Sequence, residues 1–125
     1  NKDNGLLNNG HPIIKGRTST NQINRLLTFG GSGLNGKNYT NLLRLSESSE
    51  NVVHSTGVGP IGKGDSQALA GNVGKGKVVA LGDSNGFTAM VFDQRDGTKQ
   101  KAGMNLENYD WKQFVLNTLY WLSNE

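Results

Sequence analysis

The residues of this chain with the clearest potential for chemistry follow a short apolar run. Val78–Leu81 ends abruptly at Gly82, and the next residues combine a carboxylate, a hydroxyl and an amide. In open α/β sheets, ligands bind at the loops that follow the carboxyl ends of the strands. We therefore predict a ligand-binding loop made by four consecutive residues: Gly82, Asp83, Ser84 and Asn85. The alternative is a simple turn, in which short polar side chains bond to nearby backbone N–H groups.

Ser84 can act as a nucleophile only with a base within hydrogen-bond reach. Gly82-Asp83-Ser84 resembles the block that opens the GDSL-type esterases. That family carries its catalytic Asp-x-x-His near the end of the domain, whereas His11 and His54, the two histidines here, both precede the serine. A Ser84-dependent esterase is therefore an alternative function, and no residue is assigned as catalytic.

Two glycine-rich stretches come close to the P-loop pattern G-x-x-x-x-G-K-[ST], which binds nucleotide phosphates. They are GSGLNGKN at residues 31–38 and GVGPIGKG at residues 57–64. The pattern requires a hydroxyl after the lysine to hold Mg²⁺ and a helix that follows it. Asn38 and Gly64 stand in place of that hydroxyl. A nucleotide-binding module that uses Lys37 or Lys63 is thus a second alternative.

The composition excludes several classes of protein. The 125 residues suit one domain, and 18 glycines with 34% hydrophobic residues indicate many turns. Without cysteine there is no thiol catalysis, disulfide or zinc–thiolate site, and no spacing of His, Asp and Glu matches a metal site. The net charge of +3 comes from scattered basic residues, which argues against nucleic acid as a partner. No apolar run reaches the roughly 18 residues of a membrane span, and we expect no cofactor.

Hydrophobic patterning predicts a central strand and one long helix. The run KVVALGD, bounded by glycines, predicts a strand buried on both faces, as in a parallel sheet covered by helices. The clearest helix runs from Asp110 to Ser123, with Gln113 completing a capping box. Its wide apolar stripe predicts that most of the helix, including Leu119, is buried against that strand.

The other segments give weaker patterns. Strands are expected in NQINRLLTFGGSG, YTNLLRLSES and NVVHSTG. DSQALAG predicts one helical turn, HPIIKG an extended piece or turn, and FTAMVFDQRDGTKQKAGMN mostly loop.

Several of these segments resemble the C-terminal half of a class I glutamine amidotransferase-like domain. They are HPIIKG, GKGKVVALGDSNGF and GMNLENYDWKQFVLNTLYWLS, and the resemblance spans Gly10 to Ser123. The chain is similar to the non-catalytic bacterial members of this superfamily, among them trehalose-utilisation-like proteins and domains beside polysaccharide-degrading enzymes. The resemblance implies an α/β, flavodoxin-like three-layer sandwich, with residues 1–125 as a single domain or its C-terminal part. True amidotransferases use a cysteine nucleophile, which this chain lacks, so no catalytic residue carries over.

The resemblance implies a non-catalytic binding or structural accessory domain of a bacterial protein linked to carbohydrate processing. The compartment it implies is extracytoplasmic, either periplasmic or secreted, and the ligand it implies is a carbohydrate. One strong helix cannot cover both faces of a parallel sheet, so we expect something outside these residues to complete the fold. The expected partners are the rest of the parent protein, a second chain or a homodimer mate.

Overall fold

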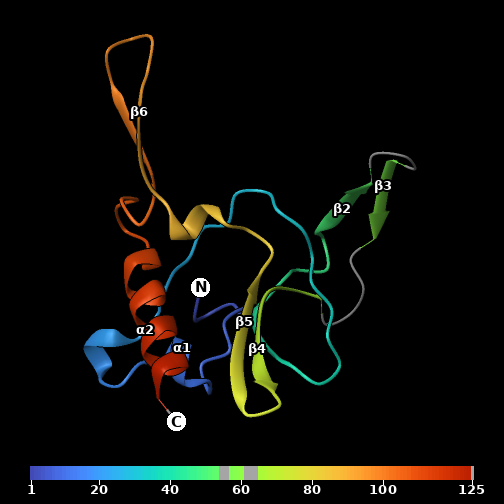
Figure 1. Cartoon of the computed structure of the whole chain (residues 1–125). Helices are drawn as coiled ribbons and strands as arrows, with labels where there is room; N and C mark the ends of the chain where they lie inside the picture. The colour runs from blue at the N-terminus through green and yellow to red at the C-terminus, as the bar shows by residue number, and fades with distance from the viewer. Residues whose placement is uncertain (54–56, 61–64, 125) are drawn as a thin grey trace.

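The computed structural model describes residues 1–53, 57–60 and 65–124, and antiparallel strands dominate it (Figure 1). Within these residues seven strands form three sheets, and every strand pair runs antiparallel. Two α-helices and two short 3₁₀-helices complete the elements. In chain order the elements are α1 (Pro12–Lys15), η1 (Ser19–Asn21), β1 (Thr40–Arg44), β2 (Glu50–Val53), β3 (Gly57–Pro60), β4 (Ser66–Val73), β5 (Gly76–Leu81), η2 (Asn85–Phe87), β6 (Ala89–Asp93), β7 (Lys99–Gly103) and α2 (Trp111–Ser123).

The expected α/β, flavodoxin-like three-layer sandwich is wrong. That fold needs a parallel sheet with helices over both faces. The described residues instead form antiparallel sheets, and α2 is their one helix longer than a single short turn. The largest sheet has the order β1–β4–β5, so β4 is central and β5 lies at an edge. Among the described residues no helix has the length and apolar character needed to cross a membrane.

β5 contains the apolar run that predicted a doubly buried parallel strand. It pairs antiparallel with β4 across a tight turn, with Gly76 opposite Val73. Val79 and Leu81 pack against the core, whereas Ala80 is exposed. A continuous apolar run therefore did not separate a buried parallel strand from an edge strand that places alternate side chains on the core.

β4 occupies the segment for which the sequence predicts a helical turn. Its residues from Ser66 to Ala70 are buried because the strand lies between two neighbours. The Ser66 hydroxyl donates to the carbonyl of Leu43 in β1 at 2.9 Å, beside a register shift in that pair. Alanine, glutamine and leucine favour helices in isolation, and pairing on both strand edges overrides that preference here.

One core joins α2, α1 and the inner face of the large sheet. Its buried residues are Leu7, Ile13, Ile14, Ile23, Leu42, Leu43, Ala68, Ala70, Trp111 and Phe114. The position of α2 confirms the predicted helix, and Phe114 is fully buried as expected. The prediction that most of the helix is buried is wrong, since Leu119 is 56% exposed and Leu116, Tyr120 and Leu122 are exposed with it.

Asp110 stands at the start of α2 but does not form the predicted capping box. Its side chain makes no cap hydrogen bond to the helix. The Oδ2 atom instead accepts the backbone N–H groups of Asn24 and Arg25, at 2.7 and 2.9 Å. Gln113 donates to Asn117 rather than reaching back to the cap. Asp110 therefore ties the 22–29 segment to the helix, and this segment does not form the strand that the sequence predicted there.

The HPIIKG segment forms the short helix α1 rather than an extended piece. His11 is extended, as the following proline requires, and its Nδ1 accepts the N–H of Ile13 at 3.2 Å. Pro12 then opens the helix, where its missing N–H is harmless. β1 and β2 confirm two of the expected strands.

β6 and β7 form a hairpin in the segment predicted to be mostly loop. Figure 1 shows it standing out from the rest of the chain. Residues 94–98 join the strands, and Gly97 takes a φ of 83° that other residues rarely adopt. Asp-Gly between alternating side chains is a strong hairpin signal, and it was present in the sequence at Asp96-Gly97.

Candidate functional site

The loop predicted to bind ligand begins with a buried carboxylate. Asp83 is 4% exposed. Its Oδ2 accepts the N–H of Phe29 at 2.6 Å, and its Oδ1 accepts the N–H of Asn85 at 2.9 Å. Asn85 in turn donates its side-chain amide to the carbonyl of Phe29 at 3.3 Å. Asp83 therefore links the segment that carries Phe29 to the segment that carries Asn85.

The other residues of the predicted site take different positions. Gly82 continues the sheet, donating to Gln67 at 2.8 Å and accepting from Ser32 at 2.9 Å. Ser84 is exposed at the surface. Asn85 lines a groove, so the structure brings one of the four predicted residues to a cavity wall. The turn alternative describes Asp83 well, because its bond to the N–H two residues later is an Asx turn.

The groove lies where the β6–β7 hairpin leaves the rest of the chain. Its volume is about 560 Å³, within the range of small-ligand sites. Its lining residues are Leu27, Phe29, Asn85, Gly86, Met90, Phe92, Asp93, Gln94, Gln100, Lys101, Ala102, Gly103, Leu106 and Trp111. Sequence reasoning identified Asn85 in this set but missed the hairpin residues, because it assigned their segment to a loop.

Trp111 forms a rigid part of the groove. The indole is almost fully buried, and its Nε1 donates to the carbonyl of Leu27 at 2.8 Å. Gly86 lies against the ring, since a Cβ at that position would meet the Trp111 ring at 2.2 Å. Close approach of η2 to the indole therefore requires glycine at position 86.

Two phenylalanine rings are exposed at the groove. Phe29 is 74% exposed and Phe92 is 47% exposed. Phe92 shares a face of the hairpin with Met90 and with Ala102, the residue opposite Met90. Val91 points to the other face and does not line the groove. The groove thus has an apolar wall supplied by alternate residues of one strand.

Amides and paired charges complete the hairpin side of the groove. The Gln94 Nε2 donates to the Gln100 Oε1 at 2.7 Å. Lys99 pairs with Asp93 at 2.6 Å, and Lys101 pairs with Glu107. The hydrogen bond and charge of Lys101 lower the pKa of Glu107.

Within the described part of the chain no histidine lies beside Ser84. His54 lies outside the described residues. The ring of His11 packs on Trp121 with centroids 5.2 Å apart, whereas the loop of Ser84 adjoins Trp111. These tryptophans stand near opposite ends of α2, about 15 Å apart at a helical rise of 1.5 Å per residue. Burial lowers the pKa of His11.

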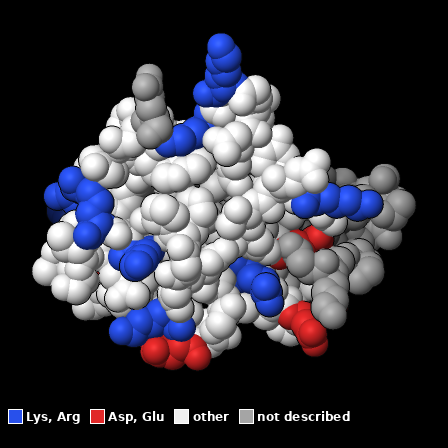
Figure 2. Space-filling view, turned by 90° about the horizontal axis from the view of Figure 1, so that it is seen from below, with Lys and Arg blue, Asp and Glu red and all other residues white. Residues whose placement is uncertain are grey.

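The two P-loop-like stretches fall in different surroundings. Lys37 lies in a turn that leads into strand β1, so the helix that the motif requires does not follow it. In the second stretch, β3 covers the first residues, and Lys63 lies outside the described residues. Figure 2 shows Lys and Arg side chains spread over the face seen from below, separated by uncharged residues rather than gathered in a stripe.

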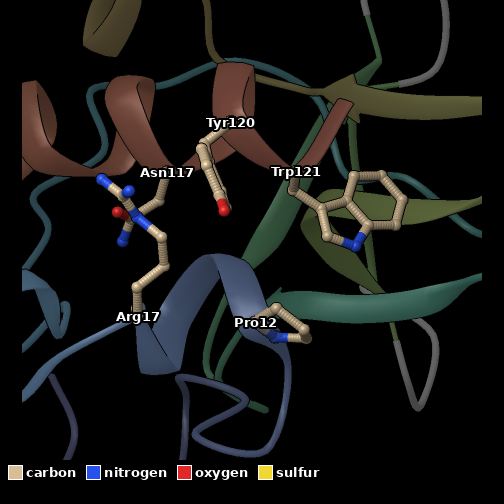
Figure 3. Close-up of a pocket in the computed structure, with 6 residues that line it drawn as sticks. Pro12, Arg17, Asn117, Tyr120 and Trp121 are labelled. Atoms are coloured by element: carbon tan, nitrogen blue, oxygen red, sulfur yellow. The ribbon is translucent and has the colours of Figure 1, made fainter. Parts of the chain in front are cut away.

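A second cavity, between α1 and α2, is much smaller. Its volume is about 70 Å³, and Pro12, Arg17, Tyr120 and Trp121 surround it (Figure 3). The Arg17 guanidinium lies over the Tyr120 ring, 4.1 Å from its centroid. Asn117 donates to the carbonyls of Ile13 and Asn21, both at 2.8 Å, and so joins α2 to α1 and η1.

Searches of family models, of curated proteins and of solved structures each found no match to this chain.

Proposed function

We propose that the chain is a non-catalytic accessory domain that binds carbohydrate in the groove beside the β6–β7 hairpin. The observation that carries this proposal is the combination of exposed rings and side-chain amides on one concave surface. Phe29 and Phe92 supply the rings, and Asn85, Gln94 and Gln100 supply the amides.

Sugars have two kinds of surface, and the groove offers a complement to each. The C–H faces of a sugar ring are apolar and flat, so they suit the face of an aromatic side chain. Hydroxyl groups both donate and accept hydrogen bonds, as do the amides of asparagine and glutamine. Phe92 and Gln100 stand directly opposite each other on β6 and β7, which places both chemistries side by side.

The absence of catalysis in this proposal rests on the loop of residues 82–85. Both oxygens of Asp83 accept backbone hydrogen bonds inside the fold, which suits a structural carboxylate better than a general acid or base. Ser84 has no histidine base beside it among the described residues. A nucleophilic hydroxyl needs such a base, so we favour binding over ester hydrolysis.

The proposed setting is an extracytoplasmic protein in which this domain works beside other parts. An isolated two-stranded hairpin is marginally stable in water. β6 and β7 pair only with each other among the described strands, and Val91 is exposed on the face away from the groove. We propose that the rest of the parent protein, a second chain or a homodimer mate lies against this hairpin.

Calorimetric titration with neutral oligosaccharides tests the proposed function. Phe92→Ala removes one ring from the groove wall and should weaken binding about tenfold, which corresponds to about 1.4 kcal/mol. Val91→Ala is the matched control, because Val91 is 51% exposed on the opposite face of the same strand. Equal losses in both variants, or no binding of any oligosaccharide by the unaltered chain, would contradict the proposal.

A further inference from the structure

The charges beside the groove are already neutralised by one another. Asp93 and Lys101 are the two charged residues that line the groove, although strand alternation places both on the same side of the hairpin as Val91. Lys99 lies 2.6 Å from Asp93, and Glu107 accepts from Lys101. Each charged lining residue therefore has a partner of opposite charge, and the hairpin side of the groove presents no net charge to a ligand.

The glutamine pair at the same wall has three N–H donors and the Gln94 Oε1 acceptor to spare. The Gln94 Nε2 donates to the Gln100 Oε1. The Gln100 Nε2 and the Gln94 Oε1 make no hydrogen bond within the described residues. A donor beside an acceptor matches a pair of hydroxyl groups, each of which can also donate and accept. A carboxylate or sulfate accepts only, so it would bind the N–H donors but leave the Gln94 Oε1 without a donor.

We infer that the groove selects neutral carbohydrates over acidic ones, with the Gln94–Gln100 pair binding adjacent hydroxyls and the two ion pairs withholding their lysines from anionic sugars. This inference rests on the proposed function and names the ligand class of the same groove. It makes a specific claim about Glu107: this residue lies outside the lining and acts on ligand choice by occupying Lys101.

The test compares neutral and acidic ligands of equal length on the full chain. The neutral probes are hexasaccharides of glucose in α- and β-linkage and of mannose in β-linkage, and the acidic probe is a hexasaccharide of galacturonic acid. We expect a neutral probe to bind at least tenfold more tightly than the acidic one in calorimetry, with an affinity that does not change between low and high salt. Gln94→Leu with Gln100→Leu should weaken the neutral probe about three- to tenfold, since two hydrogen bonds are lost.

Glu107→Gln is expected to strengthen binding of the acidic probe. A variant that merely failed to fold would bind more weakly, so it could not give this result. The substitution leaves Lys101 unpaired, so we expect the acidic probe to bind about threefold more tightly than to the unaltered chain, while the neutral probe is unchanged. Asp3→Asn is the control, because it removes an exposed carboxylate away from the hairpin. Tighter, salt-sensitive binding of the acidic probe by the unaltered chain would overturn the inference and leave the proposed function standing. Failure of every probe to bind would overturn both.

Discussion

Removal of the Asp83 carboxylate should destabilise the fold strongly. Asp83 is almost fully buried, and it accepts two backbone hydrogen bonds, one from Phe29 at 2.6 Å and one from Asn85 at 2.9 Å. Asp83→Ala leaves both N–H groups without their acceptor. Hydrogen bonds to a charged group are worth about 1.5–3 kcal/mol each, so the expected decrease in the free energy of unfolding is about 3–6 kcal/mol. That is a large share of the roughly 5–15 kcal/mol typical of a small domain.

Urea denaturation followed by tryptophan fluorescence measures this loss, with the free energy extrapolated linearly to water. Asp83→Asn keeps the shape and one acceptor oxygen, so it should lose about half as much as alanine. Asp3→Ala removes an exposed carboxylate and should stay within about 0.5 kcal/mol of the unaltered chain. If Asp83→Ala also stays within about 0.5 kcal/mol, Asp83 does not hold the loop in the way described here.

Three further substitutions test other contacts by the same denaturation. The pKa of His11 is lower in the folded chain, so the unfolded chain binds more protons and the free energy of unfolding should fall as the pH drops below 6.5. His11→Asn keeps a side-chain acceptor at the start of α1 and should flatten this pH dependence. An unchanged pH dependence in the variant would contradict the role of His11. Gly86→Ala places a methyl group against Trp111 and should cost about 1–3 kcal/mol, whereas Gly10→Ala, with no atom nearer than 3.5 Å, should have little effect. Asn117→Ala removes the donor from the carbonyls of Ile13 and Asn21 and should cost about 1–3 kcal/mol; an unaltered midpoint would refute this role.

The sequence predicted local elements better than the way they pair. The helix after Asp110 and the strand within residues 39–48 were found because periodicity and flanking turns are local signals. The pairing partner of β5 is not local, and its apolar run fits a parallel or an antiparallel strand equally well. The predicted fold class is wrong because the apolar run and the family resemblance both favour a parallel sheet, whereas the tight turn at Gly74-Lys75 joins β4 and β5 as an antiparallel pair.

The candidate site was likewise predicted only where the sequence signal is local. Asn85 was named because polar residues after an apolar strand are typical of binding loops. The opposite wall was missed because Met90 and Phe92 alternate along a strand whose Asp-Gly turn the sequence prediction did not include. Phe29 reaches the groove through the hydrogen bond to Asp83, a contact between segments far apart in the chain that no spacing rule predicts.

Two-dimensional ¹⁵N–¹H NMR during titration with the neutral hexasaccharides tests the central claim most directly, because it locates the ligand as well as detecting it. We predict shifts of the backbone amides of Phe29, Asn85 and Phe92 and of the side-chain amides of Gln94 and Gln100, with the α1–α2 side unchanged. Shifts confined to Arg17, Tyr120 and Trp121 around the smaller cavity, or no shifts at all, would contradict the assignment of the groove as the carbohydrate site.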